Sequence, residues 1–125
     1  MDRSEIGRGI LREIFGEEML ANRDKKKNSF NAVIQEYSDD VCFGRTWARE
    51  GIDRKLRSIL NVSMLTALNR PNQLRSHLEG ALNNGWTVDE LREVLLHAAV
   101  YCGLPAAVDA FKVAEEVLKG RKLLE

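Results

Sequence analysis

The chain has 125 residues, and its 19 Lys and Arg balance its 19 Asp and Glu, so the formal net charge is zero. This length fits one globular domain, and the composition, with 44% hydrophobic residues and 2 Pro, predicts a packed core rather than disorder. Because the charge is balanced and no apolar stretch has the length of a membrane span or a signal peptide core, we expect a cytoplasmic protein with neither a nucleic-acid nor a membrane partner.

Apolar residues recur with a period near 3.6 along almost the whole chain, which predicts an all-α fold of about six helices. The first helix is expected from about Ser4 to Asn22, and the polar segment 24–28 should end it. The second helix carries an apolar stripe and is expected to give way to a loop over residues 43–47. This stripe consists of Phe30, Val33, Ile34 and Tyr37.

The third and fourth helices are expected on either side of a short turn. Asp53 is suited to cap the third helix, whose wide apolar stripe predicts a core helix. The stripe consists of Leu56, Ile59, Leu60, Met64, Ala67 and Leu68. Pro71 is favourable in the first turn of the fourth helix, and Gly85 can supply the left-handed residue that ends it.

The fifth and sixth helices have well-marked boundaries. Thr87 and Glu90 form the T-x-x-E pattern of a capping box at the start of the fifth helix, which Gly103 should end. Pro105 should lie at the start of the sixth helix, which is expected to end near Gly120.

The second half of the fifth helix carries no charged side chain on any face, from Val94 to Leu104. A helix of that kind must be covered all round. A domain of about six helices can hardly surround one of its own helices, so the run predicts an interface with another subunit. The alternative is a central helix in a monomer.

Both histidines of the chain fall on predicted helices. His77 lies on the apolar side of the fourth helix, and His97 lies in the uncharged run, with Glu93 and Tyr101 one turn before and after it. Each histidine is either a catalytic group or a core residue satisfied by a neighbouring carboxylate or hydroxyl. A metal site would need a third ligand at a known spacing, and none is evident, so no metal is expected.

Two arginines lie at the start of the third helix. Arg54 and Arg57 are three positions apart, so their guanidinium groups could clamp a substrate carboxylate. The alternative is a solvated helix start with ion pairs to the acidic residues of segment 50–53. Trp47 and Phe43, which precede this segment, could roof a pocket or could simply be packed.

Five segments together carry a family resemblance. They are Phe43-Gly44 with Trp47, Gly51-Ile52-Asp53-Arg54 through Arg57-Ser58, Ala67-Leu68-Asn69-Arg70-Pro71 with Leu74 and His77, Ala81-Leu82-Asn83-Asn84-Gly85, and Glu90 through Ala107. From about Asn28 to Leu118 the chain thereby resembles the carboxymuconolactone decarboxylase family, which is similar in fold to the AhpD-type alkylhydroperoxidases. We expect a single domain over residues 1–125, with an N-terminal helix and linker over 1–27. The resemblance implies an all-α subunit that assembles into a homohexamer.

The redox branch of this family carries the pattern C-x-x-C-x-x-x-H on the helix that matches the fourth one here. Counting back from His77 places Arg70 and Gln73 at the two cysteine positions, and Cys42 and Cys102 lie elsewhere in the chain. A thiolate-based peroxidase would therefore have no nucleophile, and we do not expect that activity.

Resemblance to the decarboxylase branch implies cofactor-free conversion of 4-carboxymuconolactone to the enol-lactone of 3-oxoadipate, in the β-ketoadipate pathway of aromatic catabolism. For that reaction we expect Arg54 to bind the substrate carboxylates, with Arg57 as its helper. His77 is expected to be the general acid, and His97 to be the oxyanion partner, held in place by Tyr101 or Glu93. The reversed assignment of the two histidines is left open. The alternative is a family member that acts on another small carboxylic acid, or a non-catalytic ligand-binding oligomer.

Overall fold

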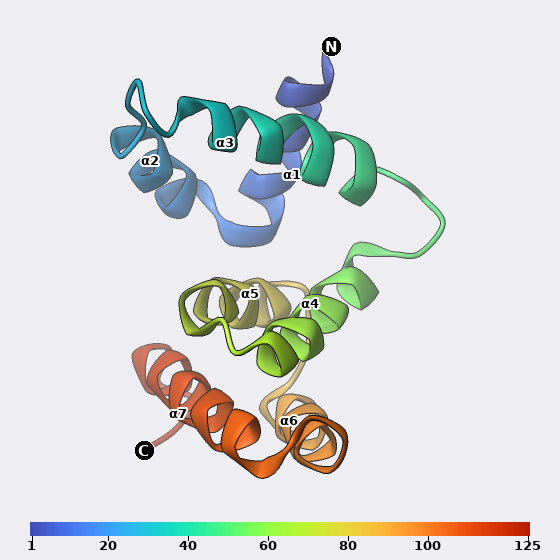
Figure 1. Ribbon diagram of the computed structural model, residues 1–125, viewed down its shortest axis with the longest axis vertical. Coiled ribbons are helices and arrows are strands. Elements are labelled where there is room, and N and C mark those ends of the chain that lie inside the picture. The colour runs from blue at the N-terminus through green and yellow to red at the C-terminus, as the bar shows by residue number, and fades with distance from the viewer. The chain divides into compact units, whose positions relative to one another are not determined.

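The computed structural model describes residues 1–125, and the chain divides into two compact units, Met1–Arg54 and Lys55–Glu125 (Figure 1). It contains seven α-helices, one π-helical segment and no strand, which confirms the predicted all-α fold class. None of the helices combines the length and the apolar character that crossing a membrane requires.

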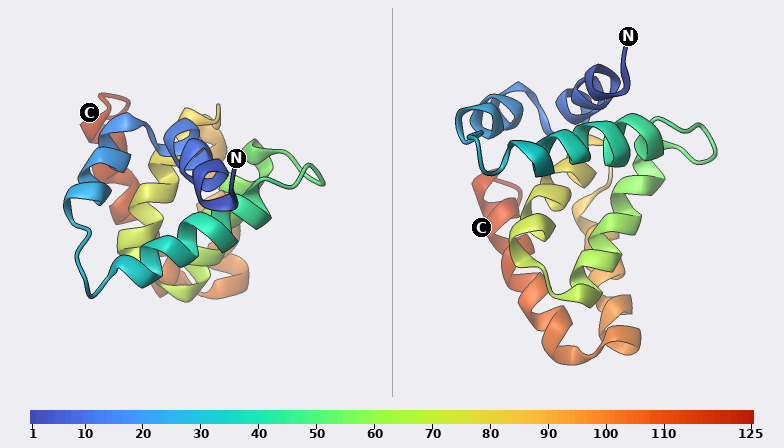
Figure 2. Two further views of the ribbon diagram at one scale, coloured as in Figure 1. Left: turned by 90° about the horizontal axis from the view of Figure 1, so that it is seen from above. Right: turned by 45° about the horizontal axis from the view of Figure 1, so that its top comes forward.

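The first unit is built from α1 (Arg3–Phe15), α2 (Glu17–Lys25), α3 (Ala32–Tyr37) and the π-helical segment η1 (Ser38–Trp47). Figure 2 shows that η1 continues α3 as one uninterrupted helical ribbon. The core of this unit consists of Ile10, Leu11, Ile14, Leu20, Phe43 and Trp47.

Two expectations for this unit were wrong. The single helix expected from Ser4 to Asn22 is two helices, because Gly16 adopts a φ of 95° that ends α1 before α2 begins. The loop expected over residues 43–47 is helical, because η1 turns Phe43 and Trp47 inward, where their rings lie 5.4 Å apart. A further finding is that the apolar stripe of the second predicted helix faces outward. Its residues are between 60% and 91% exposed: Phe30, Val33, Ile34 and Tyr37.

The second unit contains most of α4 (Arg54–Leu68), together with α5 (Pro71–Asn83), α6 (Val88–Cys102) and α7 (Leu104–Gly120). The predicted boundaries are confirmed: Gly85 and Gly103 have φ angles of 94° and 101°, and both hydrogen bonds of the Thr87 capping box are present. The core of this unit is formed mainly by Ile59, Val62, Leu74, Leu78, Leu91, Leu95, Ala110 and Val113.

The helix α4 is a core helix, but it turns a different face inward from the one predicted. Of the expected stripe only Ile59 is buried, whereas Leu56, Leu60, Met64 and Leu68 are between 38% and 62% exposed. Two hydroxyl residues are buried on α4 instead, Ser58 and Thr66. Their side chains can face the core because each donates a hydrogen bond of 2.8 Å to a carbonyl oxygen of its own helix.

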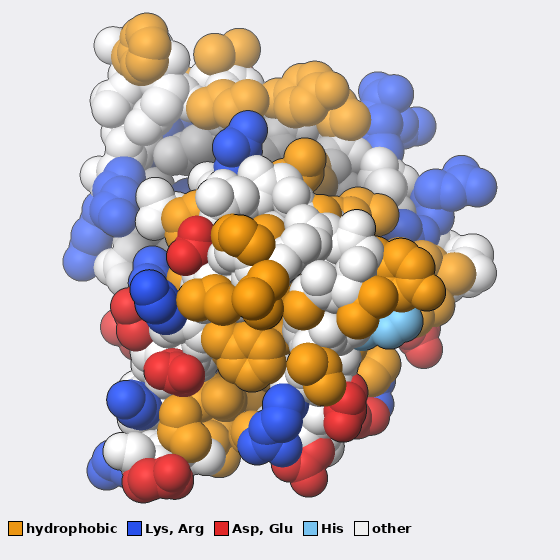
Figure 3. All heavy atoms as spheres, turned by 60° about the horizontal axis from the view of Figure 1, so that its bottom comes forward, with side chains coloured by type: hydrophobic (Ala, Val, Ile, Leu, Met, Phe, Trp, Pro, Cys, Tyr) orange, Lys and Arg blue, Asp and Glu red, His pale blue; other side chains and the backbone are white.

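The uncharged part of α6 is also not enclosed by its own chain. Its large apolar residues Leu96, Val100 and Tyr101, and Leu104 at the start of α7, are between 55% and 77% exposed. Figure 3 shows apolar side chains gathered over the part of the second unit where α6 and α7 lie. The chain alone therefore leaves uncovered the surface that the sequence predicts to be covered.

Candidate functional site

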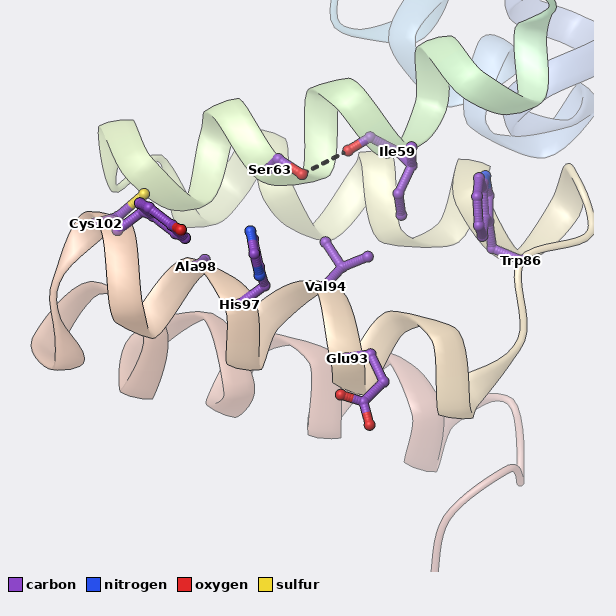
Figure 4. Close-up of a pocket in the computed structure, with 9 residues that line it drawn as sticks. Ile59, Ser63, Trp86, Glu93, Val94, His97, Ala98 and Cys102 are labelled. Carbon is purple, nitrogen blue, oxygen red and sulfur yellow. Dashed lines mark hydrogen bonds between the residues drawn. The ribbon is translucent and has the colours of Figure 1, made fainter.

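A cavity of about 700 Å³ lies between α4 and α6 (Figure 4). Its volume is in the range of small-molecule sites. Most of its lining is apolar, and the residues that form it are Ile59, Ser63, Trp86, Glu93, Val94, His97, Ala98, Tyr101 and Cys102.

The structure brings His97 and Tyr101, two of the predicted site residues, together in this cavity. Their ring centroids are 4.9 Å apart, with an angle of 41° between the ring planes. Figure 4 shows the His97 ring directed from α6 toward α4, whereas the carboxylate of Glu93 is directed away from it. Of the two helix neighbours proposed to hold His97, the structure therefore places Tyr101 beside it.

Trp86 closes one end of the cavity, although no sequence pattern singles it out. Its indole Nε1 donates a hydrogen bond of 2.7 Å to the carbonyl oxygen of Lys55, and the Lys55 ammonium lies 4.7 Å from the ring centroid. These two contacts hold the indole to the first turn of α4. Both contacts join segments that are far apart in the sequence, the start of α4 and the turn before α6. No local sequence pattern could therefore predict them.

His77 lies in a different environment from His97. Its side chain is largely buried on α5, and its Nδ1 lies 3.4 Å from Nδ2 of Asn61 on α4. Burial lowers the pKa of His77 to about 4, because a charged imidazolium is poorly solvated there. The ring is therefore neutral at pH 7.

The two histidines lie on different sides of α4. Ile59 and Ser63 of α4 line the cavity beside His97, and Asn61, two residues from each of them, contacts His77. Two helical positions are about 200° of rotation, so Asn61 points away from the cavity. Within one chain, then, His77 and His97 do not share a site.

Arg57 is on the same side of α4 as Asn61, because the two residues are four positions apart. Its side chain is half-buried. A guanidinium group, a side-chain amide and a neutral imidazole thus lie on one side of the α4–α5 pair. Such a set can bind a carboxylate and stabilise an oxyanion.

The other predicted site residues belong to the first unit. Trp47 and Arg54 line a cavity of about 280 Å³ together with Ala48, Arg49, Glu50, Ile52 and Asp53. Trp47 is buried against Phe43, so it is first of all a core residue. Arg54 forms an ion pair with Glu13 of α1. Nowhere in the chain are three His, Cys, Asp or Glu side chains gathered where they could hold a metal ion.

The buried His77 predicts an acid-sensitive second unit. Between pH 6.5 and about 4 the unfolded chain binds a proton at this residue that the folded chain does not, so the free energy of unfolding falls as the pH is lowered through this range. The lowered pKa corresponds to a loss of about 3 kcal/mol by pH 4. Urea unfolding at a series of pH values should show this loss in the parent and not in His77→Gln. Equal slopes for both proteins would contradict the prediction.

Comparison with known proteins identifies the family. Residues 33–116 match the model of the carboxymuconolactone decarboxylase family. The chain is 38% identical over 117 residues to the 4-carboxymuconolactone decarboxylase of Acinetobacter baylyi, and the aligned region covers 94% of this chain and 87% of the relative. It is 35% identical over 109 residues to the nitrosuccinic acid decarboxylase of Metarhizium robertsii, covering 87% of this chain and 76% of the relative. The chain therefore belongs to the carboxymuconolactone decarboxylase family.

Proposed function

We propose that the protein is a carboxy-lyase that decarboxylates a small carboxylic acid, with 4-carboxymuconolactone as the first candidate substrate. Family membership and the two decarboxylases among its relatives support a carboxy-lyase. The bacterial relative supports the lactone as substrate, and with it a role in the catabolism of aromatic compounds.

The reaction needs no cofactor, because the substrate supplies its own electron sink. The carboxyl group is lost from a carbon conjugated through an alkene to the lactone carbonyl, so the electrons flow into a dienolate. The protein has three tasks: to bind carboxylates, to stabilise the oxyanion, and to return a proton to carbon. Arginine suits the first task, and a positioned hydrogen-bond donor suits the second.

The observation that carries the proposal is the neutral, buried His77 beside Asn61 and on the same side of α4 as Arg57. An imidazole with a pKa of about 4 is a poor reservoir of protons at pH 7, but it remains a good hydrogen-bond donor. We therefore assign oxyanion stabilisation to His77 and carboxylate binding to Arg57. For His77 this is the reversed assignment, which the sequence left open.

His97 is the candidate for returning the proton. Its side chain is exposed in the cavity between α4 and α6, so solvent can reprotonate it between turnovers. Because it lies on the other side of α4 from Asn61, it can serve a substrate at His77 only from a second copy of the chain.

We propose a homo-oligomer, with a hexamer as the expected assembly. The exposed apolar rows on α3, α4 and α6 support association, since monomers seldom expose so many large apolar residues together. Sedimentation equilibrium at micromolar concentration should show a mass several times that of the 14.2 kDa chain. A single species at the mass of one chain would contradict the proposal.

The substrate is tested by incubating the purified protein with 4-carboxymuconolactone and following the ultraviolet absorbance of the lactone. Nitrosuccinate is assayed in parallel, because a relative of similar identity is a nitrosuccinic acid decarboxylase. Turnover of nitrosuccinate alone would favour that second substrate. No turnover of either acid at high protein concentration would favour a non-catalytic, ligand-binding oligomer.

A further inference from the structure

We propose that Asn61 is a positioning residue that fixes the tautomer of His77, so that the neutral imidazole carries its single proton on Nε2. This proposal rests on the proposed function, in which His77 donates a hydrogen bond to the oxyanion. Asn61 lies outside the segments that carry the family resemblance.

The tautomer is assigned from one contact. The atoms that meet are Nδ2 of Asn61 and Nδ1 of His77, at 3.4 Å. An amide nitrogen has two hydrogens and no lone pair to offer, so it can only donate. Nδ1 must then accept, and an accepting nitrogen carries no hydrogen. A neutral imidazole has one N–H group, so it is placed on Nε2.

The surroundings of the pair make this preference matter. Both side chains are at least half-buried, between α4 and α5, where water cannot freely replace a lost hydrogen bond. The ring stays neutral in the physiological pH range, because its burial disfavours the imidazolium. The choice between the two tautomers is therefore made by hydrogen bonding and not by charge. A ring with the wrong tautomer would present a lone pair to the oxyanion in place of a donor.

Two substitutions test the hydrogen-bond donor of Asn61, one by removing it and one by replacing it with an acceptor. Asn61→Leu keeps the side-chain volume and removes the donor, so both tautomers should become populated. Asn61→Asp replaces the donor by an acceptor, so the proton should move to Nδ1. Asn72→Leu, the same exchange at an exposed position of α5, is the matched control.

The tautomer is read directly by long-range proton–nitrogen NMR of the protein labelled with ¹⁵N-histidine. The chain has only 2 His, so His97→Gln assigns the signals. We expect Nε2 to be protonated in the parent and in Asn72→Leu, a mixture in Asn61→Leu, and protonated Nδ1 in Asn61→Asp. A proton on Nδ1 in the parent, or an unchanged tautomer in Asn61→Leu, would overturn the proposal.

Turnover supplies the second readout. Asn61→Leu should lower kcat by roughly tenfold to a hundredfold, the effect known for hydrogen-bond partners that orient metal-binding histidines, and should leave KM within about twofold. Full activity of Asn61→Leu beside an inactive His77→Leu would overturn the positioning role. The tautomer is measured without substrate, so the absence of turnover in the parent counts against the proposed function, and a wrong tautomer counts against Asn61 alone.

Discussion

Replacing His77 by Leu should lower kcat by about a hundredfold to a thousandfold, the usual cost of removing one preorganised donor to an oxyanion. The side chain is buried and neutral at pH 7, so its contribution is a hydrogen bond and not a proton. His77→Gln should lose less, about tenfold, because the glutamine amide keeps an N–H group of similar reach. A general acid would behave differently, since Gln and Leu are equally unable to deliver a proton.

Stability must be measured beside activity, because His77 is also part of the packing between α4 and α5. The melting temperature and kcat of both variants are compared with those of the parent. If His77→Leu melts far below the parent and keeps near-parent turnover while folded, His77 is a structural core residue. The catalytic role would then pass to His97.

The helix boundaries of the second unit could be predicted because their signals are local. The capping box of Thr87 and Glu90 and the left-handed glycines at 85 and 103 each depend on a few consecutive residues. No packing partner is needed to recognise them. All of them are present in the structure where the sequence placed them.

The first unit was harder to predict because its geometry depends on contacts between segments. The residues around Gly16 continue the apolar stripe on both sides, so the periodicity predicts one helix where the chain turns. The segment η1 is a π-helix, and such wide turns are rare enough that a loop was the natural expectation for a stretch with two aromatics and a glycine. Only the packing of η1 on α1 shows why that stretch is helical.

The sequence predicted which residues could form the candidate site, but not which of them lie together. Both histidines were identified from their helical positions, but the rotation of α4 decides which of them meets Asn61 and which faces the cavity. The buried face of α4 includes Ser58 and Thr66 beside Ile59 and Val62, and a hydrophobic pattern does not place such polar residues inside. Asn61 could not be predicted, because an asparagine in mid-helix gives no signal until its partner is known.

The close packing of α1 on η1 should make Gly7 the most sensitive glycine of the chain. A Cβ atom at Gly7 would overlap the carbonyl oxygen of Asp39 and lie 2.9 Å from the backbone nitrogen of Gly44. Both neighbours are backbone atoms, so the strain cannot be relieved by a side-chain rotation. Gly7→Ala should therefore destabilise the first unit by about 3 kcal/mol, at the upper end of the usual cost of overpacking.

The chain offers a matched control and a local probe for this test. Gly9 lies two residues further along α1 with nothing within 4 Å of its added Cβ, so Gly9→Ala should be neutral or stabilise the helix by up to about 1 kcal/mol. Of the 2 Trp, Trp47 belongs to the first unit and Trp86 to the second, so in a Trp86→Phe background the fluorescence follows the first unit alone. Urea unfolding should then show a lower midpoint for Gly7→Ala than for Gly9→Ala. Coincident curves for the two variants would mean that α1 and η1 can separate at little cost, and that their glycines do not determine the packing.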